Sequence, residues 1–141
     1  MSEAEKVNQR QVCWALLVDD MPFNLIVATH ILQKRGLTKT GLNGKEAIQA
    51  VEEHYRQGKE FKIILMDIKM PVIDGFEATK ILSEKMNKKH LPKIPIFAFS
   101  ANNSQQEIDL ANKSGMTGFL FKPFEEEEQF VKLMATKKIV F

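Results

Sequence analysis

Short runs of apolar residues are separated along the chain by longer segments in which apolar and polar residues mix. Three of these runs, 13–18, 61–66 and 94–99, are almost wholly apolar, and two weaker ones lie at 37–42 and 119–121. Short apolar runs bounded by polar residues are typical of strands buried on both faces of a sheet. The run 37–42 is partly polar, so we expect that strand at an edge of the sheet or half exposed.

The segments between and after these runs have the spacing of amphipathic helices. Pro22 suits the start of the first helix, and Gly36 suits its end. The other helices are expected at 44–58, from 76 onward, around 108–115 and at 124–135. The acidic run 125–128 is interpreted as the first turn of the last helix, where negative charge is favoured. Strands and helices thus alternate five times, which predicts an α/β fold with a doubly wound, five-stranded parallel sheet and five helices.

Reactive polar residues follow four of the five expected strands. The first strand ends in Asp19 and Asp20, the third in Asp67, the fourth in Ser100 and the fifth in Lys122. The carboxyl ends of parallel strands meet at one rim, and ligands of doubly wound sheets bind there. The acid pair alone has a second interpretation as a helix N-cap. In combination, the five residues predict one compact site.

This combination of side chains favours phosphoryl chemistry. Three crowded carboxylates repel one another unless a cation lies between them, and oxygen ligands favour a hard cation such as Mg²⁺ or Mn²⁺. Asp67 could then act as a carboxylate nucleophile toward phosphorus. Lys122 adds a positive charge and Ser100 a hydroxyl donor, which suit a reaction that depends on positioning and charge neutralisation.

Composition narrows the setting. The chain has 141 residues, 44% of them apolar and 27% charged, which fits one domain. A net charge of +2 and the short apolar runs favour neither direct nucleic-acid binding nor membrane insertion. The single cysteine, Cys13, allows no internal disulfide, so we expect a cytoplasmic protein. We divide the chain into an N-terminal extension or linker at 1–11, a domain at 12–135 and a tail at 136–141.

Five motifs occur in order along the chain: LVDD at 17–20, MDIKMP at 66–71, DG at 74–75, FSA at 99–101 and FKPF at 121–124. With Asn24 and NGKEA at 43–47, they resemble the receiver domain of response regulators, and most closely the receivers of hybrid sensor histidine kinases. The resemblance covers roughly residues 12–135 and implies a flavodoxin-like fold. Taken alone, Asp74-Gly75 is interpreted as ordinary turn chemistry.

The resemblance implies a phosphoacceptor and its metal ligands. Asp67 would be the residue that is phosphorylated. Asp20 would bind the metal directly, and Asp19 mainly through water. The backbone carbonyl of Lys69 would be a further metal ligand.

It also implies residues that respond to the phosphoryl group. Ser100 and Lys122 would contact that group, and Pro123 would follow a cis peptide bond. Phe119 holds the position of the switch aromatic, which turns inward when Ser100 moves. Phe119 lacks the hydroxyl of a tyrosine, so such a switch would be steric, and the residue taken alone is better explained as a core aromatic.

The resemblance implies a phosphorelay function. The phosphoryl donor would be a phosphohistidine on a histidine kinase or histidine phosphotransfer protein. A homodimer through the face of the fourth helix, fifth strand and fifth helix is a further partner that we consider. The chain would catalyse its own phosphorylation and dephosphorylation without being an enzyme in the usual sense. It would be either a free-standing regulator or a receiver fragment of a hybrid kinase.

Three other functions compete with this one. Haloacid-dehalogenase-like phosphatases carry a second aspartate two residues after the nucleophile, where this chain has Lys69. A flavin-binding module would need hydroxyls after the first strand, where Asp19 and Asp20 would repel the cofactor phosphate. A pseudo-receiver that only binds a partner is disfavoured by the full set of acids, hydroxyl and lysine, and only phosphorylation chemistry decides it.

Overall fold

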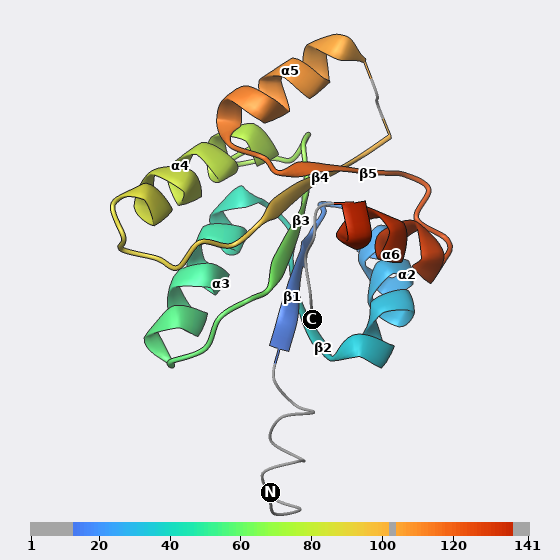
Figure 1. Ribbon diagram of the computed structural model, residues 1–141, viewed down its shortest axis with the longest axis horizontal. Coiled ribbons are helices and arrows are strands. Elements are labelled where there is room, and N and C mark those ends of the chain that lie inside the picture. Colours follow the sequence, from blue (N-terminus) through green and yellow to red (C-terminus); the bar gives the residue numbers. More distant parts are fainter. Residues whose placement is uncertain (1–12, 102–103, 137–141) are drawn as a thin grey trace, which may run out of the picture.

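The computed structural model describes residues 13–101 and 104–136, and they form a parallel sheet with helices on both faces (Figure 1). The predicted fold is confirmed. The strands are β1 (Cys13–Val18), β2 (Leu37–Gly41), β3 (Ile63–Asp67), β4 (Ile96–Ser100) and β5 (Gly118–Phe121). The helices are α2 (Pro22–Leu32), α3 (Gly44–Arg56), α4 (Gly75–Asn87), α5 (Gln105–Ser114) and α6 (Glu127–Thr136), with a short 3₁₀ turn, η1 (Gln33–Arg35), after α2.

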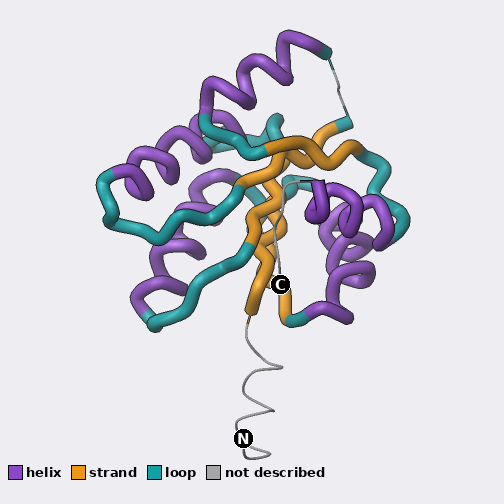
Figure 2. Tube along the Cα trace, in the orientation of Figure 1, coloured by secondary structure: helices purple, strands orange, loops and turns teal. Residues whose placement is uncertain are grey.

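The strand order is β2-β1-β3-β4-β5, so the chain reverses its winding direction at β1 and β3. The partly polar strand β2 lies at one edge, as predicted. Helices α3, α4 and α5 cover one face of the sheet, and α2 and α6 cover the other (Figures 1 and 2). The first strand shows the alternation that produces two cores: Leu16 packs with the α3–α5 side, while Leu17 packs with the α2–α6 side.

Two strands begin later than their apolar runs predict. Phe61 is buried ahead of β3 and stacks on His54, with 4.1 Å between the ring centroids. Ile94 is likewise buried ahead of β4. Both residues are apolar because their side chains enter the core from a connection, which a hydrophobic run cannot distinguish from a strand.

The last helix also begins later than predicted. Its first residue is Glu127 and not Phe124, so only half of the acidic run 125–128 lies in the first turn. The side chain of Gln129 explains this start. Its carbonyl accepts from the backbone N–H groups of Glu125 and Glu126, and its amide donates to the Pro123 carbonyl. These bonds hold the preceding residues in a loop.

The predicted N-terminal extension at 1–11 lies outside the described residues, as does all of the tail beyond Thr136. Within the described ranges, every helix is too short or too polar to cross a lipid bilayer.

Candidate functional site

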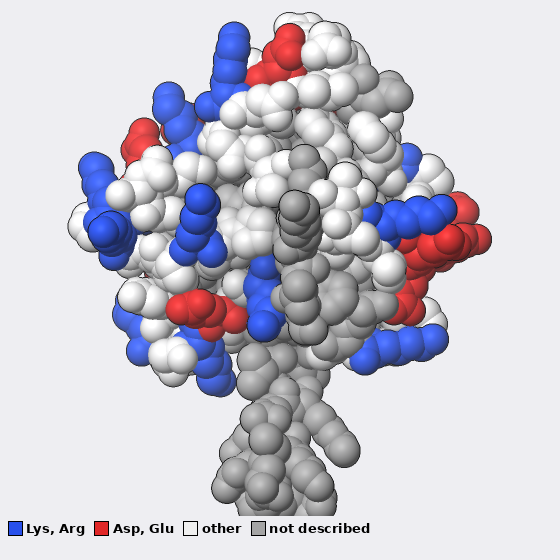
Figure 3. All heavy atoms as spheres, viewed as in Figure 1, with Lys and Arg blue, Asp and Glu red and all other residues white. Residues whose placement is uncertain are grey.

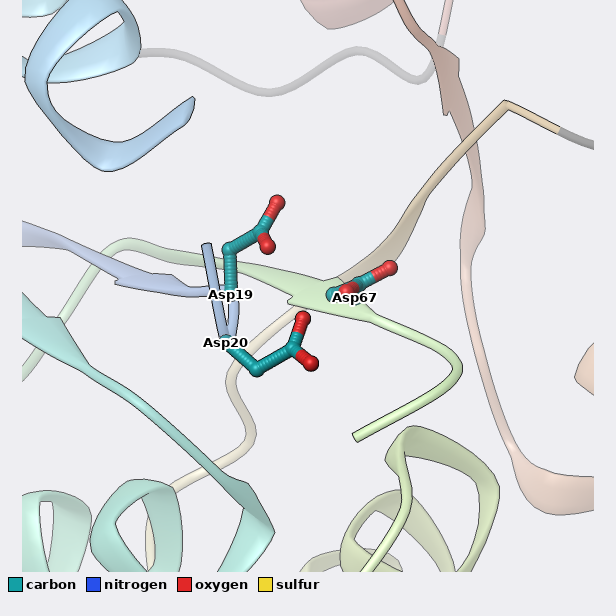
Figure 4. A group of neighbouring side chains, drawn as sticks. All are labelled: Asp19, Asp20 and Asp67. Atoms are coloured by element: carbon teal, nitrogen blue, oxygen red, sulfur yellow. The ribbon is translucent and has the colours of Figure 1, made fainter. Parts of the chain in front are cut away.

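The carboxyl ends of β1 and β3 bring the three predicted acids together. The strands are neighbours, with Val18 paired to Met66, so the residues that follow each strand lie side by side. One carboxylate oxygen from each of Asp19, Asp20 and Asp67 lies within 4.8 Å of the other two (Figure 4). This group lies at the point where the winding direction reverses, where ligands of such sheets bind.

The carboxylate of Asp19 is fully buried and held by three donors. It accepts from the Met21 backbone N–H at 2.9 Å, from Asn24 Nδ2 at 3.0 Å and from Lys122 Nζ at 2.8 Å. These contacts fix its orientation. Asp20, in contrast, is exposed at the rim. The two adjacent acids therefore differ in their surroundings: Asp19 is buried among donors, whereas Asp20 is open to solvent.

Asp67 is buried at the end of β3 but keeps a polar environment. Its Oδ1 atom accepts from the Ile68 backbone N–H at 2.9 Å and from Lys122 Nζ at 3.2 Å. Burial, and then the negative charge of Asp19, raise the pKa of Asp67 from 3.8 to about 6, although Lys122 acts in the opposite direction. Both causes disfavour the ionised form of Asp67, and a cation bound between the carboxylates would favour it.

Lys122 links the two buried acids. Burial disfavours its charged form, but its hydrogen bond to Asp19 and the charge of Asp67 outweigh that effect, so the pKa of Lys122 is raised. Its Nζ atom also lies 4.9 Å from the centre of the Phe99 ring. The peptide bond from Lys122 to Pro123 is cis. Lys122 is therefore a fixed positive charge beside Asp67.

The hydroxyl of Ser100 has a partner that the sequence did not reveal. Its Oγ donates to Glu107 Oε2 at 3.3 Å, and both side chains are buried. The spacing from Ser104 to Glu107 fits a helix N-terminus, and the Ser104 hydroxyl indeed accepts from the Glu107 N–H at 3.3 Å. That signal locates the start of α5, but it gives no indication that the glutamate side chain reaches Ser100.

The Asp74-Gly75 pair does more than form a turn. Asp74 caps α4 by accepting from the Glu77 N–H at 2.8 Å. Gly75 donates from its N–H to the Ile68 carbonyl at 2.8 Å, and a Cβ atom at this position would lie 2.1 Å from the Asp67 carbonyl oxygen. Only glycine allows α4 to begin so close to the residue that carries the predicted nucleophile.

The loop between Asp67 and α4 contains a strained residue. Val72 has φ 70°, a conformation that β-branched side chains rarely adopt, and the Ile73 N–H donates to the Pro71 carbonyl at 2.9 Å across it. Lys69 precedes this turn and is exposed. Its proposed carbonyl contact with a metal stays a prediction.

Phe119 lies partly buried against the core on the α3–α5 side and stacks on Phe121, with ring centroids 5.5 Å apart. This position agrees with both explanations of Phe119, the core aromatic and the steric switch.

Beside the acids, a hollow of about 670 Å³ opens between the β3–α4 loop and α5. Its lining includes Asp20, Lys69 and Glu107, so a ligand that approaches the acids also meets α5.

Comparison with known proteins decides the family. The sequence model of the response regulator receiver domain family matches residues 15–134 of this chain. This chain belongs to the response regulator receiver family. As a receiver domain, it is 33% identical over 133 residues to probable histidine kinase 5 of Oryza sativa subsp. japonica, a match that covers 82% of the chain. It is 30% identical over 128 residues to the sensor histidine kinase GacS of Pseudomonas protegens, covering 90% of the chain.

Solved receiver domains give the same result. The receiver of the histidine kinase CKI1 from Arabidopsis thaliana, complexed with Mg²⁺ and BeF₃⁻, is 28% identical with a TM-score of 0.79, and 93% of each chain is covered. The receiver of sensor histidine kinase PA1611 from Pseudomonas aeruginosa, with a magnesium ion coordinated in its active-site cleft, is 28% identical with a TM-score of 0.73, covering 90% of this chain and 98% of that one.

The resemblance to receivers of hybrid histidine kinases is thereby confirmed, and the phosphatase and flavin-module alternatives lose their basis. The receiver spans only 11% of the length of the rice protein and 13% of GacS. The activities of those whole proteins therefore do not carry over to it. The individual roles of its site residues remain predictions.

Proposed function

We propose that Asp67 of this receiver accepts a phosphoryl group from a phosphohistidine, with a divalent cation held beside it. The observation that carries the proposal is the position of the Asp67 carboxylate. It lies 3.2 Å from the Lys122 ammonium and close to two further carboxylates at the carboxyl edge of the sheet. A nucleophile, a fixed positive charge and an oxygen-rich cation site are the parts that phosphoryl transfer to a carboxylate requires.

The donor set fits Mg²⁺ or Mn²⁺. Asp19, Asp20 and Asp67 offer only oxygen atoms, which hard cations prefer, and the Lys69 backbone carbonyl would add a fourth. Burial, and then the negative charge of Asp19, raise the pKa of Asp67, so a cation bound between these carboxylates would favour the ionised form of Asp67. When bound, such a cation would neutralise part of the phosphoryl charge.

The chain's own residues would then act in one displacement. An Asp67 carboxylate oxygen forms a bond to phosphorus as the P–N bond to the donor imidazole breaks. The electron pair of the P–N bond returns to the imidazole nitrogen. With a pKa of about 6, Asp67 is mostly ionised at neutral pH, as a nucleophile must be. Lys122 stays protonated and stabilises the phosphoryl oxygens, while the Ser100 hydroxyl donates to one of them.

The surface beside the acids favours a protein donor. Phe23 and Ile26 on α2 are 69% and 67% exposed, and Met21 and Leu42 next to them are also exposed. Ile26 and Leu42 line a groove of about 570 Å³ between α2 and β2. A group of exposed apolar side chains beside a reactive site marks a protein interface. The donor would therefore be a histidine kinase or histidine phosphotransfer protein that covers this surface.

A second apolar surface favours the proposed homodimer face. Leu110 on α5 and Phe121 on β5 are each 42% exposed, and Val131 on α6 is 37% exposed. They belong to the three elements of that face.

Lysine and arginine side chains lie mainly on the α3–α5 side of the view in Figure 3, and acidic ones gather on its α6 side. We infer a protein partner for the α5–β5–α6 face, without direct nucleic-acid binding, and a cytoplasmic setting.

Transfer from a phosphohistidine protein tests the proposal. A radiolabelled histidine phosphotransfer protein would be mixed with the receiver and Mg²⁺, and label would be followed to the receiver band. We expect transfer to the wild type, none to Asp67→Asn, and slow transfer to Phe23→Ser. Phe23→Ser should still be labelled by acetyl phosphate, because the exposed Phe23 side chain takes no part in the contacts among Asp19, Asp67 and Lys122. Equal labelling of Asp67→Asn would contradict the proposal, and a receiver that no donor labels would be a pseudo-receiver.

A further inference from the structure

The Ser100–Glu107 contact connects the phosphoryl site with α5. Glu107 is a carboxylate on the first turn of a helix, yet it is only 8% exposed and accepts from Ser100 Oγ at 3.3 Å. The first-turn glutamates of α3 and α4, Glu46 and Glu77, are exposed. Burial of a carboxylate costs free energy unless its oxygen atoms are bonded, so this side chain is held inward for a reason that helix capping does not supply.

A serine hydroxyl has one proton to donate. In the proposed reaction the hydroxyl donates its hydrogen bond to a phosphoryl oxygen, whereas in this structure it donates to Glu107. The two bonds exclude each other.

We propose that Glu107 is a positioning residue that holds the Ser100 hydroxyl in the unphosphorylated state and releases it on phosphorylation. This inference rests on the proposed function. Once Ser100 turns to the phosphoryl group, the buried Glu107 carboxylate loses a donor. An outward movement into water then lowers the free energy of this carboxylate. The hollow beside the site is lined by Glu107 and by Lys69, so water and a positive charge are available there.

The consequence is a link from the phosphate to α5. Glu107 is the third residue of that helix, and its N–H is fixed to the Ser104 hydroxyl at 3.3 Å. An outward movement of the carboxylate therefore acts on the first turn of α5. The phosphorylated state would be favoured over the resting state by whatever weakens the Ser100–Glu107 bond, since that bond stabilises the resting state alone.

A double-mutant cycle tests this inference with BeF₃⁻, a phosphoryl mimic, titrated calorimetrically in the presence of Mg²⁺. Glu107→Met removes the acceptor, and we expect it to raise the affinity for BeF₃⁻ roughly three- to tenfold, within the range for the loss of one ordinary intramolecular hydrogen bond. In a Ser100→Ala background the same substitution should change the affinity by a factor close to one. Glu107→Gln keeps the size and one acceptor oxygen, so its effect should be smaller than that of Glu107→Met.

Glu77→Met is the matched control, because Glu77 has the same place in α4, with its N–H bonded to the Asp74 side chain. It removes a first-turn charge without touching Ser100, and we expect the affinity for BeF₃⁻ to stay unchanged. Three results would overturn the inference: no effect of Glu107→Met, an equal effect in the Ser100→Ala background, or an equal effect of Glu77→Met.

Labelling by acetyl phosphate separates this inference from the proposed function. A wild type that is labelled and binds BeF₃⁻, with unchanged affinity in Glu107→Met, overturns only the role of Glu107. A wild type that neither binds BeF₃⁻ nor accepts a phosphoryl group overturns both. The unfolding midpoint of each variant, measured in urea, shows whether the protein in the titration is folded.

Discussion

Two lysine–carboxylate contacts in this receiver have the same chemistry and different surroundings. Lys85 pairs with Glu52 between α4 and α3, with side chains 38% and 32% exposed. Lys122 contacts Asp19 and Asp67, and its side chain is 18% exposed while theirs are 0% and 11%. The first pair has one carboxylate for one ammonium, and both are open to water. The second has two buried carboxylates for one ammonium. The extra negative charge is not expected of a simple structural ion pair, but it is expected of a site that binds a further cation.

The largest difference should appear when each lysine is removed. Lys122→Met leaves Asp19 and Asp67 buried without their shared counter-charge, and we expect a loss of about 3 to 5 kcal/mol in the free energy of unfolding. Urea denaturation without divalent metal at neutral pH measures it. A loss below about 1 kcal/mol would show that water, and not Lys122, compensates the two acids.

Divalent metal should separate the two regions next. Mg²⁺ at a hundredfold excess over its dissociation constant should raise the free energy of unfolding of the wild type by about 2.7 kcal/mol. Asp20→Asn removes an exposed carboxylate that we propose as a metal ligand, so it should abolish that gain while changing the metal-free stability by less than about 0.5 kcal/mol. Thermal unfolding with and without Mg²⁺ checks both values. The same gain in Asp20→Asn would place the ion elsewhere.

Asp67→Asn sharpens the comparison through pH. The pKa of Asp67 is raised from 3.8 to about 6, so between these values the folded state binds more protons than the unfolded state. Stability from this group is therefore complete below pH 3.8 and lost as the pH rises through 6. We expect Asp67→Asn to stabilise the metal-free protein by about 1 to 3 kcal/mol at pH 7, and by less near pH 4. A destabilised variant at pH 7 would contradict the raised pKa.

The smallest effect is expected at the exposed pair. Lys85→Met should change the free energy of unfolding by less than about 1 kcal/mol, because water solvates the charge of Glu52 that remains. High salt should have an equally small effect on the contribution of this exposed pair to the free energy of unfolding of the wild type. A loss as large as that of Lys122→Met would remove the distinction between the two regions.

The sequence predicted those parts of the molecule that depend on chain order. Asp19, Asp67 and Lys122 each follow an apolar run, and parallel strands bring such ends to one rim, so the sequence is sufficient to predict that these residues lie together. The start of α6 was not, because it depends on the bonds of the Gln129 side chain to Glu125 and Glu126.

Contacts between elements account for the features that the sequence did not reveal. Gly75 resembles any turn glycine until the Asp67 carbonyl is seen 2.1 Å from where its Cβ would be. Glu107 resembles any first-turn glutamate until its carboxylate is seen against Ser100. Both residues depend on how a helix start is placed over a strand end, and neither spacing nor periodicity contains that information.

The identity of the phosphoacceptor is tested most directly by intact mass after incubation with acetyl phosphate and Mg²⁺, with Asp67→Asn in parallel and a chelator as the metal-free control. We predict that the wild type gains one phosphoryl group, that the chelator prevents it, and that Asp67→Asn gains none. A phosphoryl group on Asp67→Asn, or a folded wild type that binds Mg²⁺ and still gains none from either acetyl phosphate or a phosphohistidine protein, would contradict the assignment of Asp67.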